Sequence, residues 1–376
     1  MSPSPAGPGA QHAAAGSGAP AAPEATSGRD LRLLPKAHLH LHFTGSMRPE
    51  TLWALAEERR MRLPRSLTDD VALQVEPTRR GWFRFQRQYD TARAVVDSEA
   101  AMRRILHEAV EDDAAEGSGR LELQVDPTSY APFLGGLTPA IEIVLDQARR
   151  SEAETGVSVG IVIAASRTRH PMDARTLARL AALHAGVVVG FGLSNDERRG
   201  VTGEFAGAFR IARSAGLLSV PHGGELLGPS HVRDVVESLH PDRLGHGVRA
   251  AEDPELLARV VDAGIGFELC PASNASLGVV ERAEDVPLAR MLAAGAQIAL
   301  GADDPLLFGS RLLDQYETAR RMGLDDRALA GLAASSIRLS AAPKDVRRRL
   351  LAGVEDWLSG PVPHPPTAGP GRTAGR

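Results

Sequence analysis

Short apolar runs alternate with longer amphipathic stretches along most of the chain. The runs are bounded by Gly, Pro or Asp, and they cover residues 37–43, 120–126, 157–165, 186–193, 217–222, 243–246, 264–270 and 296–303. Stretches with helical spacing lie between most of them, for example at 139–150, 174–185, 205–214, 232–239 and 254–263. Alternating buried strands and amphipathic helices predict a parallel sheet. Eight such units predict an α/β fold with a single (β/α)8 barrel of the TIM type.

The gap between the first and second runs is longer than the others. Residues 47–59 and 98–115 in this gap have helical spacing. An aromatic patch lies between them: Trp82, Phe83, Phe85 and Tyr89. We expect extra helices inserted after the first strand, as a lid or pocket wall over the barrel mouth. For the aromatic patch we favour packing between helices over stacking on a substrate. Further helices are expected at 310–322, 325–336 and 343–358.

Both ends of the chain have a composition unlike the rest. The first 28 residues are mostly Ala, Gly, Pro and Ser, and residues 360–376 are rich in Pro and Gly. Such segments bury too little apolar surface to offset the entropy lost on ordering, so disordered tails are expected at 1–28 and 360–376. Residues 29–359 remain for one barrel domain.

Composition excludes several classes of protein. The net charge is −4, and no long block of like charge would bind nucleic acid or a membrane surface. The single cysteine, Cys270, excludes an internal disulfide framework and a zinc site with paired thiolates. The N-terminus does not resemble a Sec signal peptide. The longest uncharged apolar stretch falls short of the roughly 20 residues of a membrane helix. We expect a soluble, cytoplasmic protein with a small-molecule substrate; the sequence leaves the oligomeric state open.

Lysine is scarce, since Lys36 and Lys344 are the only two. Genomic base composition favouring arginine codons explains most of this bias. The consequence is chemical: the chain has no GxxxxGK[ST] phosphate loop, and few lysines are available for a Schiff base or a carboxylated metal bridge.

Three histidines alternate with leucine in the first apolar run. In a strand, His38, His40 and His42 point to the same side, which in a barrel with the leucines outside is the interior. A lone inward histidine is usually satisfied by a hydrogen bond, but three on one strand are hard to explain by packing alone. Active sites of such barrels lie at the carboxyl ends of the strands. We therefore predict that His40 and His42 bind a metal ion, with His38 one layer deeper.

Other strand ends supply the rest of a site. His222 and His246 end the fifth and sixth runs, Glu225 follows in a glycine turn, and Asp303 and Asp304 end the eighth. Taken singly, Glu225 could also be a solvated charge on a loop, and either aspartate could be the N-cap of a helix. Together with the first strand, they provide the histidines and carboxylate of a hydrolytic zinc site, and Glu225 and His246 would transfer protons. The residues thus predict metal-assisted hydrolysis of a small polar substrate.

At these positions the sequence resembles a known family. The matching segments are LPKAHLHLH at 34–42, HGGE at 222–225, RLGHG at 243–247, ELCPASN at 268–274 and GADDP at 301–305. As an ordered set spanning about residues 33–358, they are similar to the motifs of adenosine deaminase and its relatives, including AMP and adenine deaminases. The resemblance implies a zinc ion held by His40, His42, His222 and Asp303. It also implies that Glu225 protonates purine N1, that His246 orients and deprotonates the attacking water, and that Asp304 hydrogen bonds N7.

The residues around the expected substrate depart from the family pattern. Thr44 replaces an acidic residue associated with the ribose 5′-hydroxyl, Asn195 replaces a glycine near purine N3, Gly192 replaces an aspartate, and Gln124 replaces a frequent arginine. The fourth run contains no lysine, so the resemblance favours one metal ion over a bridged pair. These residues keep the zinc chemistry but leave the sugar side open.

Three hypotheses follow from these residues. The first is zinc-dependent deamination of adenosine, with 2′-deoxyadenosine as a second substrate, to inosine and ammonia. The second is the same chemistry on adenine or a 5′-modified adenosine such as aminodeoxyfutalosine, as Thr44, Gly192 and Asn195 suggest. The third is a non-catalytic barrel that only binds a nucleoside or a metal. Because metal binding alone requires neither Glu225 nor His246, the third is disfavoured.

Overall fold

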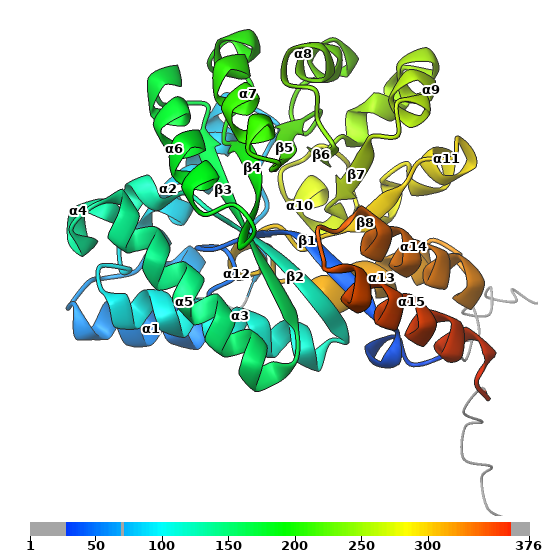
Figure 1. Ribbon diagram of the computed structural model, residues 1–376, viewed down its shortest axis with the longest axis horizontal. Coiled ribbons are helices and arrows are strands. Elements are labelled where there is room, and N and C mark those ends of the chain that lie inside the picture. Colours follow the sequence, from blue (N-terminus) through cyan, green and yellow to red (C-terminus); the bar gives the residue numbers. More distant parts are fainter. Residues whose placement is uncertain (1–27, 69–70, 362–376) are drawn as a thin grey trace, which may run out of the picture. The chain divides into compact units, whose positions relative to one another are not determined.

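The computed structural model describes residues 28–68 and 71–361, of which Asp30–Pro361 form one compact unit. Its centre is a sheet of eight strands in the order β1 to β8, every neighbouring pair parallel (Figure 1). The strands are β1 Lys36–His42, β2 Ser118–Val125, β3 Ser158–Ser166, β4 Val188–Ser194, β5 Leu218–Gly223, β6 Arg243–His246, β7 Gly266–Leu269 and β8 Ile298–Leu300. Each corresponds to one of the eight predicted runs.

The sheet closes between its first and last strands. The backbone N–H of Asp303 donates to the His40 carbonyl (3.0 Å), and the N–H of His42 donates to the Asp303 carbonyl (2.9 Å). Helix α14 packs against β1 and β8 across this junction, and the hydroxyl of its Ser336 accepts the N–H of Ala37 (3.0 Å). The prediction of a (β/α)8 barrel is confirmed.

Helices surround the sheet (Figure 1). They are α1 Pro49–Glu58, α2 Arg79–Arg93, α3 Glu99–Ala115, α4 Ala131–Leu134, α5 Leu137–Thr155, α6 Pro171–Leu183, α7 Ala206–Ser214, α8 Pro229–Leu239, α9 Pro254–Asp262, α10 Pro271–Ser276, α11 Leu288–Ala293, α12 Pro305–Phe308, α13 Leu312–Arg321, α14 Asp326–Leu339 and α15 Lys344–Ser359. No helix of the described residues has the length and apolarity needed to cross a membrane.

The predicted insertion after the first strand is confirmed as α1, α2 and α3. Side-chain caps begin two of these helices: the Thr78 hydroxyl accepts the N–H of Gly81 (3.1 Å) at α2, and the Ser98 hydroxyl accepts that of Ala101 (3.3 Å) at α3. The tails predicted at 1–28 and 360–376 lie, apart from Gly28, Gly360 and Pro361, outside the described residues.

Candidate active site

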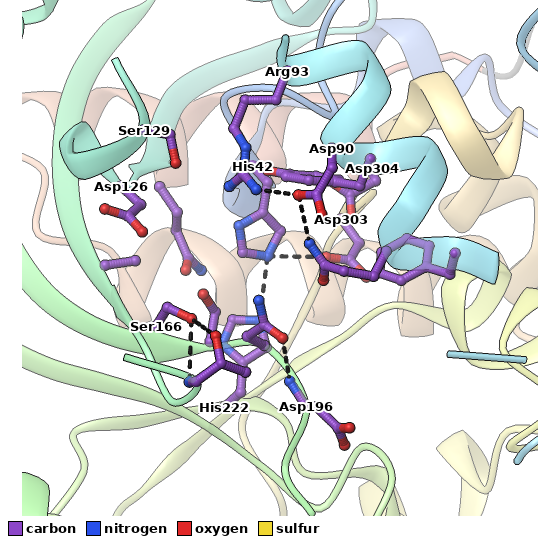
Figure 2. Close-up of a pocket in the computed structure, with 18 of the residues that line it drawn as sticks. His42, Asp90, Arg93, Asp126, Ser129, Ser166, Asp196, His222, Asp303 and Asp304 are labelled. Carbon is purple, nitrogen blue, oxygen red and sulfur yellow. Dashed lines mark hydrogen bonds and ion pairs between the residues drawn. The ribbon is translucent and has the colours of Figure 1, made fainter. Parts of the chain in front are cut away.

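A cavity of about 350 Å³ opens at the carboxyl ends of the strands. This volume lies at the lower end of the roughly 300–1,000 Å³ typical of small-molecule sites. Strand ends around the barrel supply its deep part, including His42, His222, His246 and Asp303, while α2 supplies much of its outer wall (Figure 2). The site therefore lies at the end of the barrel where the sequence analysis expected it.

Three imidazoles and one carboxylate converge at the bottom of this cavity. Nε2 of His42 lies 3.2 Å from Nε2 of His222 and 3.1 Å from Oδ1 of Asp303 (Figure 2). Nε2 of His40 lies 3.4 Å from the same aspartate oxygen. Atoms bound to one zinc ion at about 2.0–2.1 Å in tetrahedral geometry are separated by roughly these distances. The four groups predicted as metal ligands are thus close enough to share one ion.

His246 lies beside this group and faces Oδ2, the second carboxylate oxygen of Asp303. Its Nε2 is 3.8 Å from Oδ2 of Asp303 and 3.7 Å from Oε1 of Glu225. Ligand atoms of His40, His222, His246 and Asp303 all lie within 4.8 Å of one another, so His246 also belongs to the cluster. Nε2 of His42 and Nε2 of His40 face the same oxygen of Asp303, Oδ1, whereas His246 faces the other oxygen, Oδ2.

The surroundings of His40 favour positive charge at the cluster. Its Nε2 is fully buried, has no hydrogen-bond partner among the described residues and lies 3.4 Å from Oδ1 of Asp303. Its Nδ1 lies 2.8 Å from Oε2 of Glu268, so Nδ1 is the donor and Nε2 faces the cluster. Burial alone would lower the pKa of His40, but Asp303 and Glu268 raise it to about 10, which favours a proton on Nε2 as well. A metal ion in place of this proton would supply the positive charge that the two carboxylates favour.

A chain of buried ions supports His40 from below. Oε1 of Glu268 accepts from Nε of Arg243 (2.6 Å), and the guanidinium of Arg243 reaches Oε2 of Glu122 (2.7 Å). Arg120 donates to the other oxygen of Glu122 (3.1 Å). Although burial raises the pKa of Glu268, Arg243 and His40 hold it below its ordinary value. No role was predicted for these residues; charged residues at inward strand positions are the signal that would have indicated one.

Glu225 is buried next to His246, on the turn after β5. Burial, followed by the negative charges of Asp303 and Glu197, raises the pKa of Glu225 well above its ordinary value. A carboxyl group that keeps its proton at neutral pH can donate it to a substrate. Burial lowers the pKa of His246 to about 3, so the imidazole is neutral and able to accept a proton. The pair thus combines a donor and an acceptor.

Two further buried charges hold the β5 turn in place. The carboxylate of Glu197 accepts the backbone N–H groups of Glu225, Leu226 and Leu227 at 3.2, 2.8 and 2.9 Å. Arg167, at the end of β3, donates to the carbonyl of His222 (2.7 Å). Both side chains are almost fully buried. The sequence analysis missed these roles because each joins segments distant in sequence.

Asp304 faces the cavity with a free oxygen. It occupies the N-cap position of α12, yet its side chain caps no backbone N–H, and Oδ1 has no partner among the described residues. Burial, followed by the charge of Asp303, raises the pKa of Asp304 well above its ordinary value. Only glycine fits opposite it: a Cβ on Gly45 would lie 1.8 Å from Oδ1. Asp304 therefore lines the cavity with a carboxyl group whose Oδ1 is buried against Gly45 and has no hydrogen-bond partner among the described residues.

Backbone strain is concentrated at this site. Among the described residues, five that are not glycine have positive φ, and three of them line the cavity: Asn195 (81°), His246 (60°) and Asp303 (62°). Such conformations cost of order 1–3 kcal/mol each and often mark functional positions. Asn195 adopts a backbone conformation that glycine favours, which agrees with its position in place of a glycine in the family pattern.

The remaining predicted substrate residues lie in different places. Gln124 lines the cavity, with Nε2 3.5 Å from Nδ1 of His40. Thr44 and Gly192 are not among the described residues that line it. Thr44 lies behind Tyr130, with 2.6 Å between their hydroxyl oxygens, and a Cβ on Gly192 would lie 3.3 Å from the Val220 carbonyl. These two positions shape the wall of the cavity from behind.

The aromatic patch packs between elements of the protein, as expected, and it also borders the cavity. Trp82 and Phe85 are largely buried, and the Phe85 ring stacks on Phe308 with centroids 5.6 Å apart. Phe83 is 62% exposed, and it lines the outer cavity together with Tyr89. Helix α2 thus packs onto the barrel with one side and borders the cavity with its aromatic side chains.

Comparisons with known proteins agree with this geometry. The adenosine deaminase family model matches residues 35–357. A protein of Streptomyces virginiae named "Putative adenosine/adenine deaminase" is 59% identical over 335 residues, covering 88% of this chain and 99% of that protein. An aminodeoxyfutalosine deaminase of Streptomyces avermitilis is 31% identical, covering 89% and 96%. The crystal structure of an adenine deaminase from Arthrobacter aurescens is similar with a TM-score of 0.79 at 30% identity, covering 86% and 99%.

Proposed function

This chain belongs to the adenosine deaminase family and is a hydrolytic deaminase of the adenosine/adenine type, and we propose that its substrates are adenosine and 2′-deoxyadenosine. In the proposed reaction, water adds to C6 of the purine, the exocyclic C–N bond breaks, and inosine or 2′-deoxyinosine and ammonia leave. Deaminase activity is named for its relatives, whereas our proposal of a nucleoside substrate rests on the cavity of this chain.

We propose that one zinc ion is held at the bottom of the cavity. Its ligands would be His40, His42, His222 and Asp303, whose side chains meet within 3.1–3.4 Å at the contacts given above. When bound, zinc supplies a Lewis acid that makes water acidic enough to provide hydroxide at neutral pH. Nitrogen and oxygen donors in a one-metal hydrolytic site suit this ion.

The protein's own residues would move the protons. His246, neutral and buried, would accept a proton from the attacking water, because its Nε2 faces the metal cluster through Asp303 (3.8 Å). Glu225, whose pKa is raised and which lies 3.7 Å from His246, would donate a proton to N1 of the purine and make C6 more electrophilic. Asp304, whose pKa is also raised, would donate from its carboxyl group to N7 and orient the ring.

The outer cavity carries the choice of adenosine over adenine. Beyond the metal cluster its lining includes the hydroxyl-bearing residues Ser129, Tyr130, Ser166 and Thr168. Ser166 and Thr168 hydrogen bond each other (2.8 Å), and Tyr130 hydrogen bonds Thr44 (2.6 Å), but each hydroxyl can make further bonds. A ribose brings hydroxyls that donate and accept, whereas a free base brings none to this part of the cavity. We propose that this lining favours a nucleoside.

The experiment is a comparison of ammonia release from a panel of substrates. We expect the zinc-loaded protein to give the highest kcat/KM with adenosine, a similar value with 2′-deoxyadenosine and a much lower value with adenine. Adenine is the substrate named for the Arthrobacter aurescens relative, and aminodeoxyfutalosine that named for the Streptomyces avermitilis relative, so both belong in the panel. Negligible turnover of adenosine beside fast turnover of either would refute the proposal.

A further inference from the structure

We propose that Tyr130 and Tyr89 are specificity-determining residues that bind a sugar hydroxyl of the nucleoside through their phenol groups. The inference rests on the proposed function, because it presupposes a nucleoside in the cavity. It adds a hydrogen-bonding wall that stands between the substrate and Thr44, the position predicted from the sequence to meet the sugar.

Two of the three tyrosines of this chain meet at one threonine. The hydroxyl oxygens of Tyr130 and Thr44 are 2.6 Å apart, and Thr44 and Tyr130 are both among the groups that shift the pKa of the Tyr89 phenol, which therefore lies close to them. Tyr130 follows β2, Tyr89 belongs to the inserted helix α2, and Thr44 follows β1. Both tyrosines line the cavity, while Thr44, 1% exposed, lies behind them. The face presented to a ligand is therefore phenolic.

Counting protons shows what this cluster can offer. Each hydroxyl has one donor hydrogen and two acceptor lone pairs. The hydrogen bond that joins Thr44 to Tyr130 uses one of the three hydrogens. The other hydrogens and several lone pairs are left, so the cluster can both donate and accept. A sugar hydroxyl, which is both donor and acceptor, matches this pattern.

The phenols offer hydrogen bonds and no charge. Burial raises the pKa of Tyr130 to about 12, and Asp126 and Asp304 raise it further while Thr44 and Arg93 oppose the rise. The phenol therefore stays protonated. Arg93 lies over the Tyr89 ring at 5.4 Å and is paired with Asp90, while Arg169 and Arg199 also line the cavity. A sugar hydroxyl needs only the donor and acceptor atoms that the phenols supply.

The test combines variants of the enzyme with deletions in the substrate. The variants are Tyr130→Phe and Tyr89→Phe, with Tyr316→Phe as the matched control. Tyr316 is the third tyrosine, buried on α13 beside Lys36 at the start of β1, away from the cavity. The substrates are adenosine, its 2′-, 3′- and 5′-deoxy forms, and adenine. For each pair kcat and KM are measured by ammonia release, and the melting temperature of each variant is recorded.

We expect each cavity variant to lose about five- to tenfold in kcat/KM for adenosine, mainly through KM, as the loss of one neutral hydrogen bond implies. The loss should shrink to within about twofold for the one deoxynucleoside that lacks the bonded hydroxyl, and for adenine. Tyr316→Phe should show no such dependence on substrate. An equal loss for all five substrates would overturn the inference while leaving the proposed function intact. If the wild-type enzyme does not deaminate adenosine, both fail. If Tyr130→Phe unfolds, the same comparison is decided on Tyr89→Phe.

Discussion

Replacing Glu268 with glutamine tests the support beneath the proposed metal site. Glu268 bridges Nδ1 of His40 (2.8 Å) and Nε of Arg243 (2.6 Å), with at most 1% of any of the three side chains exposed. Glutamine has the same shape but carries no charge. The glutamine side chain turns its NH2 group, a hydrogen-bond donor, toward either His40 or Arg243, and both of these neighbours are donors themselves. At least one buried donor is left unsatisfied.

The structure sets the size of the effect. Removing one partner of a buried ion pair costs about 3–5 kcal/mol, because the remaining charge stays buried. Arg243 keeps Glu122, 2.7 Å away, as a second carboxylate, so we expect a loss in unfolding free energy at the lower end, about 3 kcal/mol. His40 also loses the acceptor that directs its Nε2 lone pair toward the metal. Such losses reduce metal affinity by about 10–100-fold.

Two measurements check this prediction. Urea unfolding of the metal-free protein gives the loss of stability, and competition with a chromogenic chelator gives the zinc dissociation constant. Glu281→Gln is the matched control, since Glu281 is exposed on a loop after α10. If Glu268→Gln bound zinc as tightly as wild type and unfolded at the same urea concentration, the account of the buried ion chain would be wrong.

Three further predictions follow from individual contacts. Glu225→Gln should bind zinc normally but lower kcat for deamination by about 10²–10⁴-fold, because the proton donor is lost; unchanged kcat would refute its role. Gly45→Ala should lower kcat/KM, because the new methyl group would push against Asp304. Gly331→Ala in α14, where a Cβ would meet no atom within 4 Å, should instead raise the free energy of unfolding by about 0.5–1 kcal/mol. Equal activity of the two variants would contradict the prediction for Gly45. Burial lowers the pKa of Lys36 from 10.5 to about 8, despite nearby carboxylates. Between pH 8 and 10.5 the unfolded chain therefore binds more protons at Lys36 than the folded chain does. The free energy of unfolding of wild type, relative to that of Lys36→Met, should rise over this pH range. A difference between the two proteins that stays constant with pH would show that the pKa of Lys36 is not lowered.

The barrel could be predicted because its strands are buried on both faces. Such strands appear as short apolar runs, and all eight were found. Their boundaries were less certain where the backbone leaves the sheet early. The last run was predicted to extend to residue 303, yet β8 ends at Leu300, and Asp303 has a φ of 62°, outside the extended range. The carboxylate that turns toward the histidines depends on this departure, which an apolar pattern does not encode.

The inward histidines and strand-end carboxylates were predictable for a similar reason, since strand alternation and barrel geometry place them together. Their supporting residues were not. Glu197 binds a turn about thirty residues further along the chain, and Arg243 meets Glu122 across the barrel. Thr44 was expected at the substrate, but the two tyrosines stand in front of it. Contacts of this kind are set by tertiary packing, and no local spacing indicates them.

A competition between two substrates tests the central proposal most directly. Zinc-loaded enzyme is given equal concentrations of adenosine and adenine, and the early ratio of inosine to hypoxanthine is measured by chromatography. This ratio equals the ratio of the two kcat/KM values. Because the outer cavity presents hydroxyl groups that can make further hydrogen bonds to a ribose, we predict that inosine predominates by at least about tenfold. Predominance of hypoxanthine would contradict the account and assign the cavity to the free base.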